Sequence, residues 1–264
     1  MPTKSFEIIE GSPLSNVILH VPHASRIIPS EVRRTLLLND KELEDELDEM
    51  TDTNTDSLAQ QASEFSEIRP WIFNNLLSRL VVDPERFPDA REIMNQIGMG
   101  VVYHRTSQGL KLREVDEGRD NSLIKEYFEP YSKALETLVH SLLGTKGSVT
   151  IIDVHSYRID EHPNGVNRGL RRPDICLGTD AFHTPAWLDG AAYRAFETAG
   201  LVIRNEPYAG TYIPLAFYEN NSDVTSVMME NREDNLTGHG FDKSVQALVQ
   251  LINEIQARGN ATSN

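Results

Sequence analysis

The sequence predicts an α/β fold, in which a mixed but mostly parallel sheet is covered by helices on both faces, and two observations lead to it. Several short segments are almost continuously apolar, which is typical of strands buried on both faces of a sheet. Between them lie longer segments in which apolar residues recur every three or four positions, as in amphipathic helices. Because the two patterns alternate, we expect strand–helix–strand units in one domain that spans residues 1–264.

The expected strands are the apolar runs, most of them rich in valine, isoleucine and leucine. They cover residues 16–21, 80–83, 149–154, 174–177, 201–204 and 225–229. Most lack the regular polar alternation of a strand with one wet face, which supports a sheet covered on both sides.

Helical periodicity is clearest in residues 121–143, where Pro130 can introduce a kink and Gly144 supplies a stop signal. The other expected helices are an acidic segment at 41–49, a segment at 184–196, and a final helix at 242–257 that ends at Gly259. Two long connections, 84–120 and 158–173, are expected to be functional loops, because loops of such length usually carry function or mobility.

The composition of the chain excludes several classes of partner. It has 25 Lys and Arg against 40 Asp and Glu, a formal net charge of −15, whereas binding to a nucleic-acid backbone requires a basic face. No stretch approaches the roughly 20 apolar residues that span a bilayer, and the N-terminus lacks the apolar core of a signal peptide. We therefore expect a cytoplasmic protein without nucleic-acid or membrane partners. The one cysteine, Cys176, lies in an apolar run and is expected to be a buried structural thiol.

Two histidines stand where predicted strands end. His23 follows the run at 16–21, and His155 directly follows the run at 149–154. The carboxyl ends of strands are where α/β proteins place their chemistry. Two imidazoles and a carboxylate from a third loop would make the three-ligand set of a catalytic zinc site, which leaves the fourth position to water. These residues indicate a metallohydrolase. His20 is a weaker candidate, since strand parity turns it away from His23 unless the chain turns at the intervening proline.

Six short motifs, taken together, resemble the N-formylglutamate amidohydrolase family. They are VPHA (21–24), TDTNTDSL (51–58), SRLVVDPER (78–86), DVHS (153–156), NEPYAG (205–210) and ME (229–230). Each motif alone is weak, but their combination in the order of the family is specific. The resemblance implies a fold related to that of zinc carboxypeptidases, a zinc-exopeptidase-like (phosphorylase/hydrolase-like) arrangement in which loops above the strand ends hold zinc.

The resemblance also implies a site for one zinc ion. His23 and His155 match its two imidazole ligands, and Asp52 matches its carboxylate ligand. Asp56 is an open alternative to Asp52, because it lies four residues later and one turn of helix would put both carboxylates on the same face.

The motif at the end of the last predicted core strand offers a catalytic carboxylate. Glu230 resembles the glutamate that follows an apolar strand in zinc carboxypeptidases, where a carboxylate can carry a proton from water to the leaving nitrogen. Glu206 is the competing base. Its motif is assigned instead to a loop that encloses the substrate, in which Tyr208 is expected to contact the substrate.

The activity implied by the resemblance is hydrolysis of an N-formyl or N-acyl amino acid, first of all N-formyl-L-glutamate to glutamate and formate. Such a small molecule carries a free carboxylate, which arginine can hold through two parallel hydrogen bonds; Arg79, Arg86 and Arg158 are the candidates. The sequence departs from a common family form at Pro84-Glu85, where Leu-Asn is often found, so another carboxylate-bearing amide or peptide stays open. A noncatalytic metal-dependent binding protein is the alternative from another class, but both histidines and the glutamate favour an enzyme of amino-acid metabolism.

Overall fold

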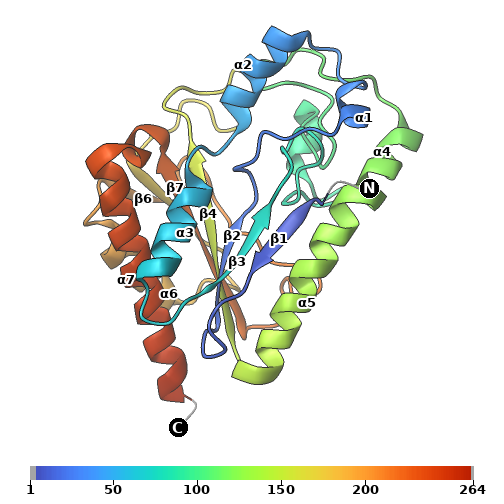
Figure 1. The fold of residues 1–264 in the computed structure, drawn as a ribbon. Coiled ribbons are helices and arrows are strands. Elements are labelled where there is room, and N and C mark those ends of the chain that lie inside the picture. The colour runs from blue at the N-terminus through green and yellow to red at the C-terminus, as the bar shows by residue number, and fades with distance from the viewer. Residues whose placement is uncertain (1–3, 263–264) are drawn as a thin grey trace.

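The order of the strands brings the segments with the predicted site residues to the centre of the sheet. The structure, a computed structural model, describes residues 4–262, which form a seven-stranded sheet between helices (Figure 1). The strands are β1 (Phe6–Ile9), β2 (Val17–Val21), β3 (Trp71–Asn75), β4 (Val149–Tyr157), β5 (Ile175–Gly178), β6 (Val202–Arg204) and β7 (Val224–Arg232). They lie in the order β1-β3-β2-β4-β7-β5-β6.

The strand directions confirm the predicted mixed, mostly parallel sheet. Strands β3, β2, β4 and β7 pair in parallel, and β5 pairs in parallel with β6. Strand β1 is antiparallel to β3, and β5 is antiparallel to β7. The carboxyl ends of β2, β4 and β7 therefore meet at one edge of the sheet, as the sequence predicted for the two histidines.

Helices cover both faces of the sheet. They are α1 (Ser30–Arg33), α2 (Asp40–Met50), α3 (Thr55–Phe65), α4 (Glu117–Leu123), α5 (Glu129–Lys146), α6 (Ala186–Phe196) and α7 (Gly238–Thr262), with short helical turns η1 (Ile93–Ile97), η2 (Ile124–Phe128) and η3 (Glu233–Leu236). Helices α3, α6 and α7 lie on one face and α5 lies on the other (Figure 1). Within the described residues, no helix is both long and apolar enough to cross a membrane.

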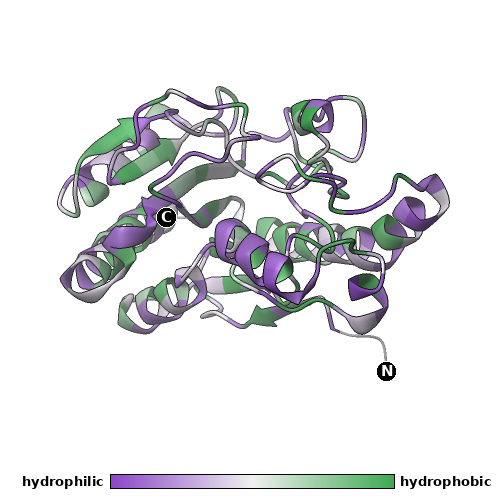
Figure 2. Cartoon of the chain, turned by 90° about the horizontal axis from the view of Figure 1, so that it is seen from above, coloured by the Kyte–Doolittle hydropathy of each residue, from purple (hydrophilic) through white to green (hydrophobic). Residues whose placement is uncertain are grey.

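Alternating residues of the strands fill two separate apolar layers. In β2, Val17, Leu19 and Val21 pack with α3 and α7, whereas Ile18 packs with α5 on the opposite face. All four side chains are fully buried, as expected for a strand covered on both sides. The helices are apolar on part of their surface and hydrophilic on the rest, consistent with one face packed on the sheet (Figure 2).

The predicted strand at 80–83 is wrong, and strands β1 and β3 and helices α1 and α3 were missed. Residues 80–83 form turns, and their apolar side chains are buried in two clusters beneath loops rather than in the sheet. Apolar character alone cannot distinguish these two kinds of burial. Strands β1 and β3 and helix α3 are short segments whose apolar pattern is interrupted by polar residues.

Several helix ends also differ from those predicted. Residues 117–146 are helical without a break, through α4, the π-helical segment η2 and α5, and Pro130 lies at the start of α5, just after η2. Gly144 lies inside α5, and the helix ends at Gly147, whose φ of 76° is the left-handed conformation that favours glycine. The final helix begins at Gly238 and continues past Gly259 to Thr262.

The two glycines of α5 provide a matched pair for testing where the helix ends. Neither has an atom within 4 Å of an added Cβ, so only the backbone conformation distinguishes them. We expect Gly144→Ala to raise the free energy of unfolding by roughly 0.5–1 kcal/mol, because alanine is the better helix former. Gly147→Ala should lower it by about 1–2 kcal/mol, because a side chain disfavours positive φ. Urea unfolding measures both; stabilisation by Gly147→Ala would contradict the helix end described here.

Candidate functional site

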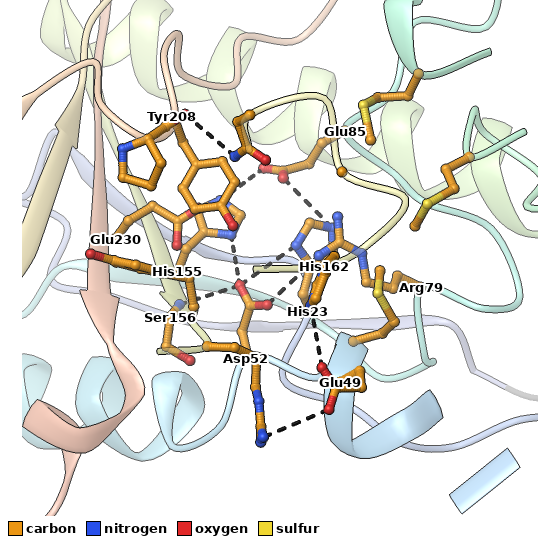
Figure 3. Close-up of a pocket in the computed structure, with 18 of the residues that line it drawn as sticks. His23, Glu49, Asp52, Arg79, Glu85, His155, Ser156, His162, Tyr208 and Glu230 are labelled. Carbon is orange, nitrogen blue, oxygen red and sulfur yellow. Dashed lines mark hydrogen bonds and ion pairs between the residues drawn. The ribbon is translucent and has the colours of Figure 1, made fainter. Parts of the chain in front are cut away.

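A pocket of about 370 Å³ opens at the carboxyl ends of β2, β4 and β7 (Figure 3). Both long connections that were predicted to be functional contribute to its wall. The first supplies Glu85, Arg86, Ile93, Met94 and Met99, and the second supplies Arg158, His162, Gly165, Val166 and Asn167. The predicted site residues His23, Asp52, Arg79, Arg86, His155, Arg158, Tyr208 and Glu230 all line this pocket.

Three buried side chains in the pocket could hold a metal ion. Asp52 Oδ2 lies 2.8 Å from His155 Nδ1 and 3.7 Å from His23 Nδ1, and ligand atoms of all three residues lie within 4.8 Å of one another. Each of the three residues is at most 5% exposed. His23 Nδ1 is buried without a hydrogen-bond partner, so a bound cation would give this nitrogen the partner that it lacks. Two imidazoles and a carboxylate are a ligand set that zinc takes.

Local structure brings these three residues together. His23 lies two residues beyond β2, and its carbonyl accepts a 3.0 Å hydrogen bond from the backbone N–H of Asp52. Asp52 lies in the short connection between α2 and α3, and His155 lies within β4, which is longer than predicted. Asp56, the alternative to Asp52, is in the first turn of α3 and accepts from the N–H of Ser57 instead.

Carboxylate oxygens lie near the far nitrogens of both imidazoles, through a hydrogen bond at His23 and through ion-pair contacts without a hydrogen bond at His155. His23 Nε2 is 3.0 Å from Asp83 Oδ1, and His155 Nε2 is 3.2 Å from Asp153 Oδ1 and 3.3 Å from Glu85 Oε1. Such carboxylate–histidine contacts fix the orientation of a metal-binding imidazole. Asp83 and Glu85 lie far along the chain from the rings that they contact, so no local pattern marks them as partners, whereas Asp153 is only two residues from His155.

The charged groups around the three residues oppose the effect of burial. Burial by itself would raise the pKa of Asp52, but hydrogen bonds from His155 and His23 lower it below its ordinary value. Burial by itself would lower the pKa of His155, but Glu85, Asp153 and Asp52 raise it well above its ordinary value. The cluster thus stabilises an ionised carboxylate next to positive charge.

Glu230 lies beside His155 because the two are direct partners in the parallel pairing of β4 and β7. Its side chain is buried, and Oε2 has no hydrogen-bond partner. Burial, together with negative Asp52, raises the pKa of Glu230 to about 8 against the opposing effect of His155. A carboxyl group with a pKa near neutrality can both accept and donate a proton.

Glu206, the competing base, lies elsewhere. Its two oxygens accept hydrogen bonds from the backbone and side chain of Arg171, and it is not among the residues that line the pocket. Its neighbours Pro207 and Tyr208 do line the pocket, and Tyr208 lies on the same side as Glu230 (Figure 3).

The three candidate arginines differ in how far they are already neutralised. Arg79 Nη2 is 2.7 Å from Asp83, and its Nη1 is 3.7 Å from Asp52. Arg158 pairs with Glu233 at 3.2 Å and with Glu49 at 3.7 Å. Arg86 pairs only through Nε, at 3.3 Å from Asp83 Oδ2, and its terminal nitrogens donate no hydrogen bond to a described residue.

Three further histidines lie in the pocket or in the core. His162 lines the pocket 3.6 Å from Glu49, and burial lowers its pKa to about 4. Its place in the predicted functional loop 158–173 was a usable signal for a role in the pocket. His20 lies under the pocket, where Nδ1 bonds Asp153 and Nε2 bonds Tyr131. His183 is fully buried and bonds backbone groups.

Cys176 is buried, as predicted, next to the site. It is the antiparallel partner of Glu230 across β5 and β7, and its thiol donates to the carbonyl of Tyr208 at 3.1 Å. Burial raises the pKa of Cys176 to about 12, so the thiol stays protonated at neutral pH.

Comparisons with known proteins agree with this geometry. The family model described as N-formylglutamate amidohydrolase matches residues 15–237. The crystal structure of N-formylglutamate amidohydrolase from Ralstonia eutropha JMP134 is 18% identical, covers 98% of this chain and 99% of its own, and superposes with a TM-score of 0.80. The crystal structure of gene product Atu2144 from Agrobacterium tumefaciens is 19% identical, covers 99% and 97%, and has a TM-score of 0.71. Both likenesses show a shared fold. No curated protein sequence matches the chain.

The two candidate carboxylates can be separated by metal binding. We expect the protein to bind one equivalent of zinc, Asp52→Asn to weaken zinc affinity by more than about 100-fold, and Asp56→Asn to leave it unchanged. Equilibrium dialysis with metal analysis measures the affinities, and circular dichroism checks that both variants are folded. Loss of zinc from the Asp56 variant alone would reverse the assignment.

Proposed function

Since the chain belongs to the N-formylglutamate amidohydrolase family, we propose that it is a zinc-dependent hydrolase that cleaves the amide bond of an N-formyl or N-acyl amino acid. One observation supports this above the others. An imidazole nitrogen of His23 and a carboxylate oxygen of Glu230, both buried and unpartnered, line the same pocket as Asp52 and His155. N-formyl-L-glutamate is the reference substrate, with glutamate and formate as products.

In this proposal, His23, Asp52 and His155 hold the metal ion, and Asp83, Asp153 and Glu85 fix the two imidazole rings. A divalent cation supplies Lewis acidity, which polarises the substrate carbonyl and makes water more acidic. The remaining chemistry belongs to the side chains of the protein.

Glu230 is proposed as the general base and then the general acid. Its position beside His155 puts a carboxylate next to the proposed ligands, and its raised pKa suits transfer of a proton from the attacking water to the leaving nitrogen. Arg79 is proposed to stabilise negative charge on the carbonyl oxygen, because Nη1 lies 3.7 Å from Asp52 at the pocket wall.

Arg86 is proposed as the main partner of the substrate carboxylate, because its terminal nitrogens remain available. Arg158 is proposed to shape the neighbouring wall, since Glu233 and Glu49 already neutralise it. Tyr208 and the loop that carries it are proposed to enclose the substrate on the side of Glu230 (Figure 3).

Replacing Glu230 tests the proton transfer. Glu230→Gln should retain zinc and lower kcat by about 10²- to 10⁴-fold, the usual contribution of a general acid–base. Glu206→Gln is the matched comparison and should retain most activity, because Glu206 lies outside the pocket. Formate release from N-formyl-L-glutamate, with metal content measured on the same samples, gives the result. Full activity of Glu230→Gln would refute this mechanism.

Replacing the arginines tests how the carboxylate is held. Arg86→Ala should raise KM by about 10- to 100-fold, because charged hydrogen bonds typically contribute about 1.5–3 kcal/mol. Arg158→Ala should raise it less, because that arginine is already paired with two carboxylates. Steady-state kinetics separate KM from kcat. A larger effect at Arg158 would reassign the carboxylate position.

A further inference from the structure

We propose that the amino-acid part of the preferred substrate carries a single carboxylate and an apolar side chain, so that N-formylmethionine-like compounds are better substrates than N-formylglutamate. This rests on the proposed amide hydrolysis and specifies the class of amino acid. The apolar side chain would lie against Met50, Met94 and Met99, which we call the methionine wall.

The pocket has an available positive side chain for one substrate carboxylate. Glutamate would bring a second, on its side chain, and that group would need another available cation. Among the pocket-lining residues that the structure describes, the arginines are Arg79, Arg86 and Arg158, and lysine is absent. Arg79 and Arg158 are each held between two carboxylates, which leaves Arg86 for the substrate.

Two carboxyl groups in the interior of the pocket further disfavour a second substrate carboxylate. Glu85 Oε1 and Glu230 Oε2 are buried in the pocket without hydrogen-bond partners. A carboxylate that entered beside them would lose its hydration without gaining a free cation, which opposes binding.

The methionine wall is the part of an apolar cluster that lines the pocket. Met50 and Met99 are buried in that cluster with Leu80 and Tyr103, and Met94 packs against it while remaining partly exposed. At the rim, Ile93 is 62% exposed. Methionine side chains are flexible and polarisable, so they can fit apolar groups of different shapes.

The methionine wall lies on the same side of the pocket as the proposed carboxylate position. Tyr103, which belongs to the cluster behind the wall, bonds both Arg79 and Asp83, and Asp83 pairs with Arg86. Sulfur-containing side chains gather on the Arg79 side of the pocket, opposite Tyr208 and Glu230 (Figure 3). A substrate whose carboxylate is held by Arg86 would therefore direct its side chain towards the methionine wall.

Three N-formyl amino acids of similar length test this proposal. N-formyl-L-glutamate carries a second charge, N-formyl-L-glutamine replaces that charge with an amide, and N-formyl-L-methionine is apolar. We expect kcat/KM to rise in this order, with methionine above glutamate by at least about tenfold, since burial of such a side chain is favourable. Calorimetric binding of free L-methionine and L-glutamate to the zinc-loaded protein should show the same order without turnover.

A cation placed in the methionine wall should reverse the preference. Met94 is partly exposed, so the lysine of Met94→Lys can bring its ammonium group to a second substrate carboxylate. This variant should lower the methionine-to-glutamate ratio of kcat/KM by about tenfold or more. Gln96→Lys adds the same charge to η1 at an exposed residue outside the pocket and should leave the ratio unchanged. Met94→Leu should keep the order of substrates.

The outcomes separate this inference from the proposed function. Hydrolysis of all three compounds with glutamate preferred would overturn the inference and leave the proposed amide hydrolysis intact. An unchanged ratio in Met94→Lys would also overturn it. Hydrolysis of none of them by zinc-loaded protein, together with absence of amino-acid binding, would reject both.

Discussion

The parallel pairing of β4 with β7 is the constraint on which the site depends. The two strands stay in register from Val149↔Val224 to Tyr157↔Arg232, which makes His155 and Glu230 direct neighbours. Since side chains alternate between the two faces, a slip of one residue would turn the two groups to opposite faces. Two site residues on loops, His23 and Asp52, are positioned next to this pair. A backbone hydrogen bond joins Asp52 to His23, and the Asp52 carboxylate contacts the ring of His155.

Asp83 links the proposed metal position with the proposed carboxylate position. It is fully buried, and it contacts His23 Nε2 at 3.0 Å, the hydroxyl of Tyr103 at 2.5 Å and Arg79 Nη2 at 2.7 Å. Burial would raise its pKa, but Arg79 and Arg86 hold it well below the ordinary value. Because an unpaired buried charge is strongly unfavourable, this carboxylate fixes one imidazole and two guanidinium groups as a unit.

The central strands and the convergence of the main site residues could be predicted from the sequence, because both depend on local patterns. An apolar run that ends in a histidine or a glutamate identifies a side chain at the carboxyl end of a strand, and parallel strands bring such ends together. The failure at 80–83 has the same origin, since an apolar run buried beneath loops has the same composition as a strand.

What could not be predicted is how distant side chains neutralise one another. Arg79, Arg86 and Arg158 are equivalent candidates in the sequence, and only their pairing with Asp83, Glu233 and Glu49 distinguishes them. The methionine wall was missed for a related reason. Met50 comes from the end of α2 and Met99 from a loop far along the chain, and neither belongs to a pattern that marks a binding surface.

The reactivity of Cys176 can report local opening of the structure next to the site. The buried thiol lies beside Glu230, its partner in the pairing of β5 and β7, and donates a hydrogen bond to the carbonyl of Tyr208. Separation of β5 from β7, or displacement of the loop that carries Tyr208, would expose the sulfur to solvent. Those events would also displace the proposed base or one wall of the pocket. The rate at which a small thiol reagent labels the native protein therefore measures how often the structure around the site opens locally. The measurement needs no substrate, metal or introduced label.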